Sequence, residues 1–220
     1  GSEGNLVLQG LEDGRFQVEA GHPLATVPGV NAALWGDYDN DGLVDVYLCR
    51  NGANQLWRQL AVGEWEDITA SSSTAAGDWN TVDGAFFDAD HDGDLDLVLV
   101  NRDGPNELLN NNLDGSFQPL AAERGLAGEP GSESLMVLPA DLDSDRDVDL
   151  VVLNAAAPHD VFLNDRLWDY HRAEGFEAFS TNPAKAVIAA DVDADGLNEL
   201  YTASPDGTLR RWRTGTQGAM

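Results

Sequence analysis

The sequence predicts an all-β fold, a β-propeller or propeller segment of about four blades with four antiparallel strands each. Three observations predict it. An acidic motif recurs four times at intervals of about fifty residues, each copy lies between two short apolar runs, and no repeat offers a helical period of useful length. With 42% hydrophobic and 8% aromatic residues, the 220-residue chain also has the composition of a globular protein.

The acidic motif reads DYDNDGLVD in its first copy, then DADHDGDLD, DLDSDRDVD and DVDADGLNE. The copies begin at Asp37, Asp88, Asp141 and Asp191, which are 51, 53 and 50 residues apart. Each copy follows an apolar run such as AALWG and precedes another such as VDVYLC, rich in Val, Leu and aromatic residues as strands are. We therefore expect the motif to join the first and second strands of each blade.

Further strands complete each repeat. A turn-rich segment follows the second strand, and a third and usually a fourth apolar segment come next, as in QLWRQL and EWEDIT. Residues 1–220 are predicted to form a single domain. Its repeats are predicted near residues 30–70, 80–122, 134–178 and 185–214, with a partial blade at residues 5–20.

The two ends of the chain leave the number of blades open. Residues 5–20 resemble a third and a fourth strand, whereas the last repeat stops after its third strand, TLRRWR. Either the N-terminal strands complete the last blade of a four-bladed ring, or the chain is a segment of a larger propeller, which is the favoured interpretation. Open blade edges can also pair between chains, so an oligomer is conceivable.

Aromatic and sulfur side chains are expected in the core. Cys49 lies in an apolar run and has no second cysteine to pair with, so a buried, unreactive thiol is predicted. The tryptophans fall mostly within or beside strand segments, where packing between blades is their expected role. They are Trp35, Trp57, Trp65, Trp79, Trp168 and Trp212.

The acidic motif has the spacing of a calcium-binding loop. In the pattern DxDxDGxxD, the carboxylates at positions 1, 3, 5 and 9 can converge while position 7 contributes its main-chain carbonyl, the oxygen-only arrangement that Ca²⁺ prefers. Acidic turns without metal are the alternative, but four copies at matched spacing argue against it. We expect about four Ca²⁺ ions. The predicted ligands are Asp37, Asp39, Asp41, Leu43 and Asp45; Asp88, Asp90, Asp92, Asp94 and Asp96; Asp141, Asp143, Asp145, Asp147 and Asp149; and Asp191, Asp193, Asp195, Leu197 and Glu199.

An EF-hand is disfavoured, because its twelve-residue loop needs a Glu at the last position and a helix on either side. The corresponding residues here are Leu48, Leu99, Val152 and Thr202, none of which chelates, and the flanking segments resemble strands. The third motif has Arg146 where the others have glycine. If that position needs a positive φ, a side chain there is costly, so we expect the third site to be the weakest.

The charge balance excludes several kinds of partner. Against 12 Lys and Arg stand 39 Asp and Glu, and a formal net charge of -27 repels polyphosphates and anionic lipids, so no nucleic-acid partner is expected. No apolar run approaches the ~20 residues that cross a membrane, so no membrane insertion is expected. Neither GxSxG nor HExxH occurs, and the four histidines lack metal-ligand spacing, so the chain is predicted not to be an enzyme.

Aspartate-rich loops of this form, set between two strands at blade spacing, resemble the FG-GAP or VCBS repeats of integrin α-subunit propellers and many bacterial secreted proteins. The segments WGDYDNDGLVDVYL and LDGSF are most similar to the repeats of ASPIC/UnbV-type and cartilage acidic proteins. The resemblance implies a calcium-binding, non-enzymatic module for protein interaction or adhesion in an extracellular or periplasmic setting. A carbohydrate-binding lectin and part of a Ca²⁺-dependent polysaccharide lyase are the alternatives.

The resemblance also implies where a partner binds. In integrin-like propellers the metal loops lie on one face and partners bind the opposite face, which is built from the turns between second and third strands and the links between blades. Trp79, Arg102, Asp103 and His159 are the candidate residues for a protein or glycan partner. An exposed Trp79 would stack on a sugar ring or a peptide, and burial between blades is its alternative role.

Overall fold

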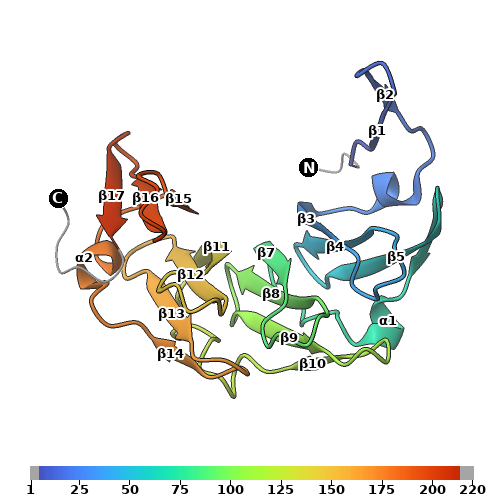
Figure 1. Ribbon diagram of the computed structural model, residues 1–220. Coiled ribbons are helices and arrows are strands. Elements are labelled where there is room, and N and C mark those ends of the chain that lie inside the picture. The colour runs from blue at the N-terminus through green and yellow to red at the C-terminus, as the bar shows by residue number, and fades with distance from the viewer. Residues whose placement is uncertain (1–4, 214–220) are drawn as a thin grey trace.

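Four antiparallel sheets follow one another along the chain and lie side by side in an open arc (Figure 1). The structure is a computed structural model that describes residues 5–213. Each acidic motif joins the first and second strands of a sheet, as predicted. The all-β, propeller-like architecture is therefore confirmed, and no helix in the described residues is long and apolar enough to cross a membrane.

Three of the sheets have four strands, in chain order. The first comprises β3 (Val30–Gly36), β4 (Asp45–Arg50), β5 (Gln55–Ala61) and β6 (Glu64–Asp67). The second comprises β7 (Thr81–Phe87), β8 (Asp96–Asn101), β9 (Glu107–Asn111) and β10 (Phe117–Pro119). The third comprises β11 (Ser134–Ala140), β12 (Asp149–Asn154), β13 (Asp160–Asn164) and β14 (Tyr170–Arg172). Single turns of helix lie in the connections: η1 (Pro23–Thr26), α1 (Thr69–Ser72) and α2 (Glu177–Ser180).

The fourth sheet has only three strands, β15 (Ala186–Ala190), β16 (Glu199–Ala203) and β17 (Leu209–Arg213). The N-terminal strands β1 (Leu8–Gly10) and β2 (Phe16–Val18) pair with each other and not with this sheet. They lie beside the first sheet, at the far end of the arc from β17 (Figure 1). Among the described residues, the N-terminal strands therefore do not close a four-bladed ring.

The second strand of each complete sheet is apolar on both faces because each face packs against a different neighbour. Along β8, Leu97 and Leu99 pack in a cluster with residues of the first sheet, whereas Val98 and Val100 pack in a cluster with residues of the third. Side chains alternate between the faces of a strand, so consecutive apolar residues serve two separate cores. This explains why DLVLVN and DLVVLN carry no polar alternation.

Neighbouring sheets approach most closely at their first strands, since β7 contacts both β3 and β11. A Cβ atom added to Gly84 in β7 would lie 2.6 Å from the Val98 carbonyl oxygen and 2.9 Å from Leu34 of the first sheet. A side chain at this position would force the first and second sheets apart.

The predicted burial of Cys49 is confirmed, and burial raises the pKa of its thiol to about 12. Trp168 and Trp212 are buried as expected. The prediction is wrong for Trp35, which is 55% exposed because, within residues 5–213, no further sheet covers that face of the first sheet. Ile188, in the last sheet, is likewise exposed at the other end of the arc.

We expect Gly84→Ala to lower the free energy of unfolding by about 2 kcal/mol and the melting temperature by ~4–8 °C, because the added methyl group overpacks the contact between sheets. Thermal unfolding followed by circular dichroism measures this. Gly10→Ala is the matched control, since its Cβ would have no neighbour closer than 3.9 Å. Equal melting temperatures for the two variants would show that the sheets adjust freely at Gly84.

Candidate metal centres

Four connections at the same end of their sheets carry the acidic motifs. They are residues 37–45, 88–96, 141–149 and 191–199, hereafter the first to fourth metal loops. The aspartate at position 1 curls each loop by accepting hydrogen bonds from its main chain. In the first loop, Asp37 accepts from the N–H groups of Asp41 at 3.0 Å and Gly42 at 2.9 Å. These bonds turn the other acidic side chains of the loop toward Asp37.

Carboxylate oxygens converge in every loop, within 4.8 Å of one another. Positions 1 and 3 take part in all four groups, position 9 in three, and position 5 only in the first. The groups are Asp37, Asp39 and Asp41; Asp88, Asp90 and Asp96; Asp141, Asp143 and Asp149; and Asp191, Asp193 and Glu199. Oxygen-only groups of this kind suit Ca²⁺ and offer nothing to softer metals.

The aspartate at position 5 stabilises the turn of its own loop. Its Oδ1 atom accepts a hydrogen bond from the main-chain N–H of position 7, two residues later, as short aspartate side chains do in turns. The four pairs are Asp41 with Leu43, Asp92 with Asp94, Asp145 with Asp147, and Asp195 with Leu197. This bond uses only one oxygen of each carboxylate, and in the first loop the other oxygen of Asp41 lies 2.9 Å from the Arg58 guanidinium.

The acid at position 9 is buried at the start of the second strand. Burial raises the pKa of Asp45 to about 6 and the pKa values of Asp96 and Asp149 to about 7, against the hydrogen bonds that favour their charged forms. Asp96, for example, accepts from the N–H groups of Ala89 and Asn111, each at 2.9 Å. A divalent cation beside these carboxylates would lower their pKa values again.

Position 7 provides a feature that the sequence analysis missed, because only its carbonyl was considered. The Asp94 side chain is 1% exposed, and neither of its oxygens has a hydrogen-bond partner in the described part of the chain. Burial and the neighbouring Asp92 raise the pKa of Asp94 to about 7. A buried carboxylate without a partner is costly, so the second loop has the chemistry of a cation site.

In the third loop, the equivalent Asp147 already has side-chain partners. His91 Nε2 lies 2.8 Å from its Oδ1 atom, and the Arg166 guanidinium lies 3.6 Å from its Oδ2 atom. His91 comes from position 4 of the second loop, where no ligand was predicted, and it joins neighbouring blades. The aspartate at position 7 therefore has side-chain partners in the third loop, whereas in the second loop it has no hydrogen-bond partner among the described residues.

Arginines from third strands reach two of the loops, which the sequence analysis also missed. Arg58 of β5 lies 2.7 Å from Asp39 and 2.9 Å from Asp41. Arg211 of β17 lies 2.8 Å from both Asp193 and Glu199. The only signal in the sequence is a basic residue in the third strand, in QLWRQL and TLRRWR. These guanidinium groups compete with a metal ion at the first and fourth loops.

The second loop is contacted by an indole instead. Trp168 Nε1 donates a hydrogen bond of 3.0 Å to Asp90 Oδ2. A neutral donor orients this carboxylate without cancelling its charge, so no arginine of the described chain competes with a cation at Asp90 in the way that Arg58 and Arg211 do in the first and fourth loops.

Position 6 needs a left-handed backbone in all four loops. Its φ angle is +88° at Gly42, +91° at Gly93, +78° at Arg146 and +90° at Gly196. The condition on which we predicted a weakened third site is therefore fulfilled. Arg146 adopts a left-handed conformation, which is unfavourable by ~1 kcal/mol or more for a residue with a side chain.

On the opposite face, three of the four candidate partner residues line one hollow of about 610 Å³: Trp79, Arg102 and Asp103. Trp79 is 36% exposed and rests on two glycines, since a Cβ atom at Gly104 or Gly77 would lie 2.2 or 2.4 Å from its indole. The expected burial of Trp79 between blades is therefore wrong. The glycines hold the ring as a rigid platform at the surface.

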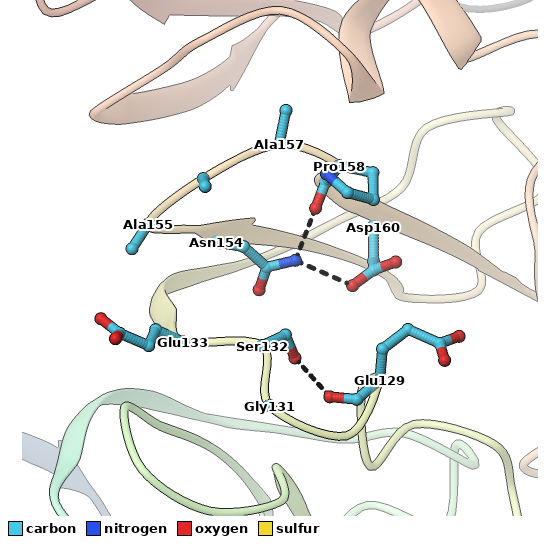
Figure 2. A pocket seen from close by; sticks show the side chains of 10 residues that line it. Glu129, Gly131, Ser132, Glu133, Asn154, Ala155, Ala157, Pro158 and Asp160 are labelled. Carbon is cyan, nitrogen blue, oxygen red and sulfur yellow. Dashed lines mark hydrogen bonds between the residues drawn. The ribbon is translucent and has the colours of Figure 1, made fainter.

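A second hollow of about 390 Å³ adjoins the first and shares the segment 129–133 with it. Figure 2 shows Ser132 hydrogen-bonded to the carbonyl of Glu129 on one side of this hollow. On the other side, the Asn154 amide donates to the Pro158 carbonyl and to the Asp160 carboxylate. Polar groups from two connections thus surround a concave surface.

His159 does not belong to this surface, and its prediction as a partner residue is wrong. The side chain is buried, its Nδ1 accepts from the Asn154 N–H at 3.2 Å, and its Nε2 lies 3.0 Å from the Asn182 carbonyl oxygen. Burial lowers the pKa of His159. It takes the structural place of Asn106 in the second sheet, whose side chain accepts from the corresponding Asn101 N–H.

Known proteins with similar sequences match the segments that contain the acidic motifs. The model of the FG-GAP-like repeat family matches residues 37–99 and 88–152, which together span more than half of the chain. Cartilage acidic protein 1 of Mus musculus is 34% identical over 109 residues, and that of Homo sapiens is 33% identical over the same length. Each alignment covers 48% of this chain. It covers only about a sixth of the relative's own length, 17% in the Mus musculus protein and 16% in the Homo sapiens protein.

Solved structures of similar shape include an Agrocybe aegerita lectin that recognises non-reducing terminal N-acetylglucosamine, with a TM-score of 0.56 and 16% identity over 88% of this chain and 51% of the lectin. A rhamnogalacturonan lyase of Bacillus licheniformis has a TM-score of 0.52 and 15% identity over 96% of this chain and 44% of the enzyme. At these identities the likeness concerns the fold alone.

We expect Arg146→Gly to raise the stability of the protein by about 1 kcal/mol and to strengthen calcium binding at the third loop about fivefold, because glycine relieves the left-handed strain. Titration calorimetry and thermal unfolding measure the two effects. Arg146→Gln removes the charge but keeps the strain, so it is the control for electrostatics. If both variants gain affinity equally, charge rather than backbone strain weakens this loop.

Proposed function

Because the chain belongs to the FG-GAP-like repeat family, we propose that it is a calcium-binding, non-enzymatic β-propeller module that binds a protein or glycan partner outside the cell. The observation that carries this proposal is the convergence of acidic oxygens in four loops at equivalent places of four sheets. We propose that residues 1–220 act as one domain.

The proposed ligands are the side chains at positions 1, 3, 5 and 9 of each metal loop, with the carbonyl of position 7. Two features of the loops support calcium rather than simple acidic turns. The acids at position 9 are buried rather than solvated, and the Asp94 carboxylate has no hydrogen-bond partner within residues 5–213. Burying like charges together is unfavourable unless a cation compensates them.

An extracellular or periplasmic setting follows from the strength expected of such sites. Loops shared with arginines, such as the first with Arg58 and the fourth with Arg211, bind calcium weakly because each guanidinium has to be displaced. Weak calcium modules work at 10⁻⁴–10⁻³ M Ca²⁺, a level typical of the space outside cells. The repeats that match cartilage acidic protein 1 agree with such a setting.

The hollow around Trp79 is the proposed partner site. A rigid, half-exposed indole offers a large contact area at little entropic cost, and Arg102 and Asp103 beside it supply polar specificity. Asp103 is itself oriented by the Asn80 N–H at 2.6 Å. A sugar ring and a peptide both suit such a platform, so a lectin is the second candidate function.

Catalysis is disfavoured by the placement of the histidines. His159 is buried with both ring nitrogens engaged, and His91 is engaged by Asp147. Incubating the chain with rhamnogalacturonan and following the absorbance of unsaturated products tests the lyase alternative. A rate above that of buffer would overturn the non-enzymatic assignment.

We expect removal of calcium to destabilise the protein. A ligand that binds only the folded state stabilises it by about 1.4 kcal/mol per site at a tenfold excess over its Kd, so the loss of several sites in EGTA should lower the melting temperature by ~5–10 °C or more relative to millimolar Ca²⁺. Magnesium is the control, because its stricter octahedral geometry suits these loops poorly. A melting temperature that EGTA leaves unchanged would contradict the calcium proposal.

We expect Trp79→Ala to abolish partner binding in a chain that still folds, with a lower melting temperature because the indole packs on Gly77 and Gly104. On a glycan array, signals of the parental chain should fall at least tenfold in this variant, since a stacking residue at the centre of a site contributes 2 kcal/mol or more. Trp35→Ala, which removes an exposed tryptophan far along the first sheet, should retain them. If the parental chain gives no signal on the array, the lectin function is excluded and binding of a protein partner remains the proposed function.

A further inference from the structure

A continuous chain of buried hydrogen bonds connects three of the metal loops. It starts at Asp149, the acid at position 9 of the third loop, whose Oδ1 atom accepts from the main-chain N–H of Asn164 at 2.9 Å. The Asn164 side chain crosses to the second blade and donates to the Ala89 carbonyl at 2.9 Å. Ala89 occupies position 2 of the second metal loop, and its N–H donates to Asp96 at 2.9 Å.

The same pattern repeats one blade further. Asp96, at position 9 of the second loop, accepts from the main-chain N–H of Asn111 at 2.9 Å. The Asn111 side chain crosses to the first blade and donates to the Tyr38 carbonyl at 2.8 Å. Tyr38 occupies position 2 of the first loop, and its N–H donates to Asp45 at 3.3 Å. The acids at position 9 of three loops are thus linked in series.

Every member of this chain is buried, so no water competes for its hydrogen bonds. The seven residues are Asp149, Asn164, Ala89, Asp96, Asn111, Tyr38 and Asp45. Each buried donor or acceptor depends on its partner, because an unmade hydrogen bond in the interior is costly. A shift of one carboxylate therefore has to be accommodated by the next blade.

We propose that Asn164 and Asn111 are positioning residues that couple neighbouring metal loops, so that a cation bound in one loop strengthens binding in the loop of the preceding blade. This inference rests on the proposed calcium binding. A cation at the third loop fixes Asp149, which fixes the main chain at Asn164. The Asn164 amide then holds position 2 of the second loop, whose N–H orients Asp96 for its own cation.

The positions of the two asparagines support a role in coupling neighbouring metal loops rather than only in stabilising their own sheets. Both lie at the last residue of a third strand, β9 or β13, where the main chain pairs with position 9 of its own blade. The side-chain amide of Asn164 makes its one hydrogen bond across the blade boundary, whereas Asn111 also donates to Leu95 at 3.3 Å within its own blade. Asn164 is therefore the cleaner residue to test.

The test measures the binding of Tb³⁺, as a luminescent substitute for Ca²⁺, to the full chain. Trp168 Nε1 lies 3.0 Å from Asp90 of the second loop, so the Tb³⁺ luminescence that is excited through tryptophan and lost in Trp168→Phe reports that loop. Four proteins are titrated: the parental chain, Asn164→Ala, a variant with the third loop disabled by Asp141→Asn and Asp143→Asn, and the combination. The interaction between the two changes is the coupling.

In the parental chain, disabling the third loop should weaken Tb³⁺ binding at the second loop about tenfold. In the Asn164→Ala background, the same change should weaken it less than twofold, because the connection is already broken. Asn110→Ala, next to Asn111 in β9, is the control for loss of an asparagine side chain: within residues 5–213 its amide donates only to Asn112, at 3.0 Å, so the tenfold effect should persist.

An equal effect of disabling the third loop with and without Asn164 would overturn the coupling, and so would no effect in either background. Absence of Tb³⁺ binding to any loop would overturn the calcium proposal as well, so the two failures are distinguishable. Circular dichroism confirms folding of each protein. If Asn164→Ala does not fold, Asn164→Ser replaces it, since the shorter side chain keeps a polar group but does not reach Ala89.

Discussion

A buried acid at the start of each second strand is the constraint on which the rest of the structure depends. Asp45, Asp96, Asp149 and Glu199 each occupy this place, where β4, β8, β12 and β16 begin. In the first three sheets the carboxylate accepts one hydrogen bond from its metal loop and another from the third strand, so it ties three segments together. Its burial is unfavourable without a compensating charge, which is why the loop around it is shaped to hold a cation.

The blades depend on one another through both apolar and polar contacts. Strands such as β8 are apolar on both faces, so a single sheet cannot bury its own core and needs a neighbour on each side. Asn111 and Asn164 add hydrogen bonds across the same boundaries. The geometry of the acidic loops and the contacts between blades are consequently parts of one hydrogen-bonded network.

The four loops are alike in sequence but not in surroundings. Arg58 and Arg211 contact acids of the first and fourth loops, Arg146 strains the third, and Trp168 orients Asp90 of the second without adding charge. Among the described residues, the second loop also holds the Asp94 carboxylate, which has no hydrogen-bond partner. Trp79 lies on the opposite face, so the proposed partner site is separate from the four acidic loops.

The sequence alone determined the repeat, the strands on either side of each acidic loop, the all-β class and the acidic oxygens that converge, because these depend on local spacing and alternation. It also identified Arg146 as an unusual residue for its loop. Only the tertiary structure decided what lies next to the acidic loops: Arg58 on a third strand, and Trp168 and Asn164 from the following blade. It also decided that His159 is buried and that Trp35 and Trp79 are exposed. These contacts join residues far apart in the chain, and packing between blades determines them, so the sequence shows that Asn111 and Asn164 recur at the repeat spacing but not what they contact.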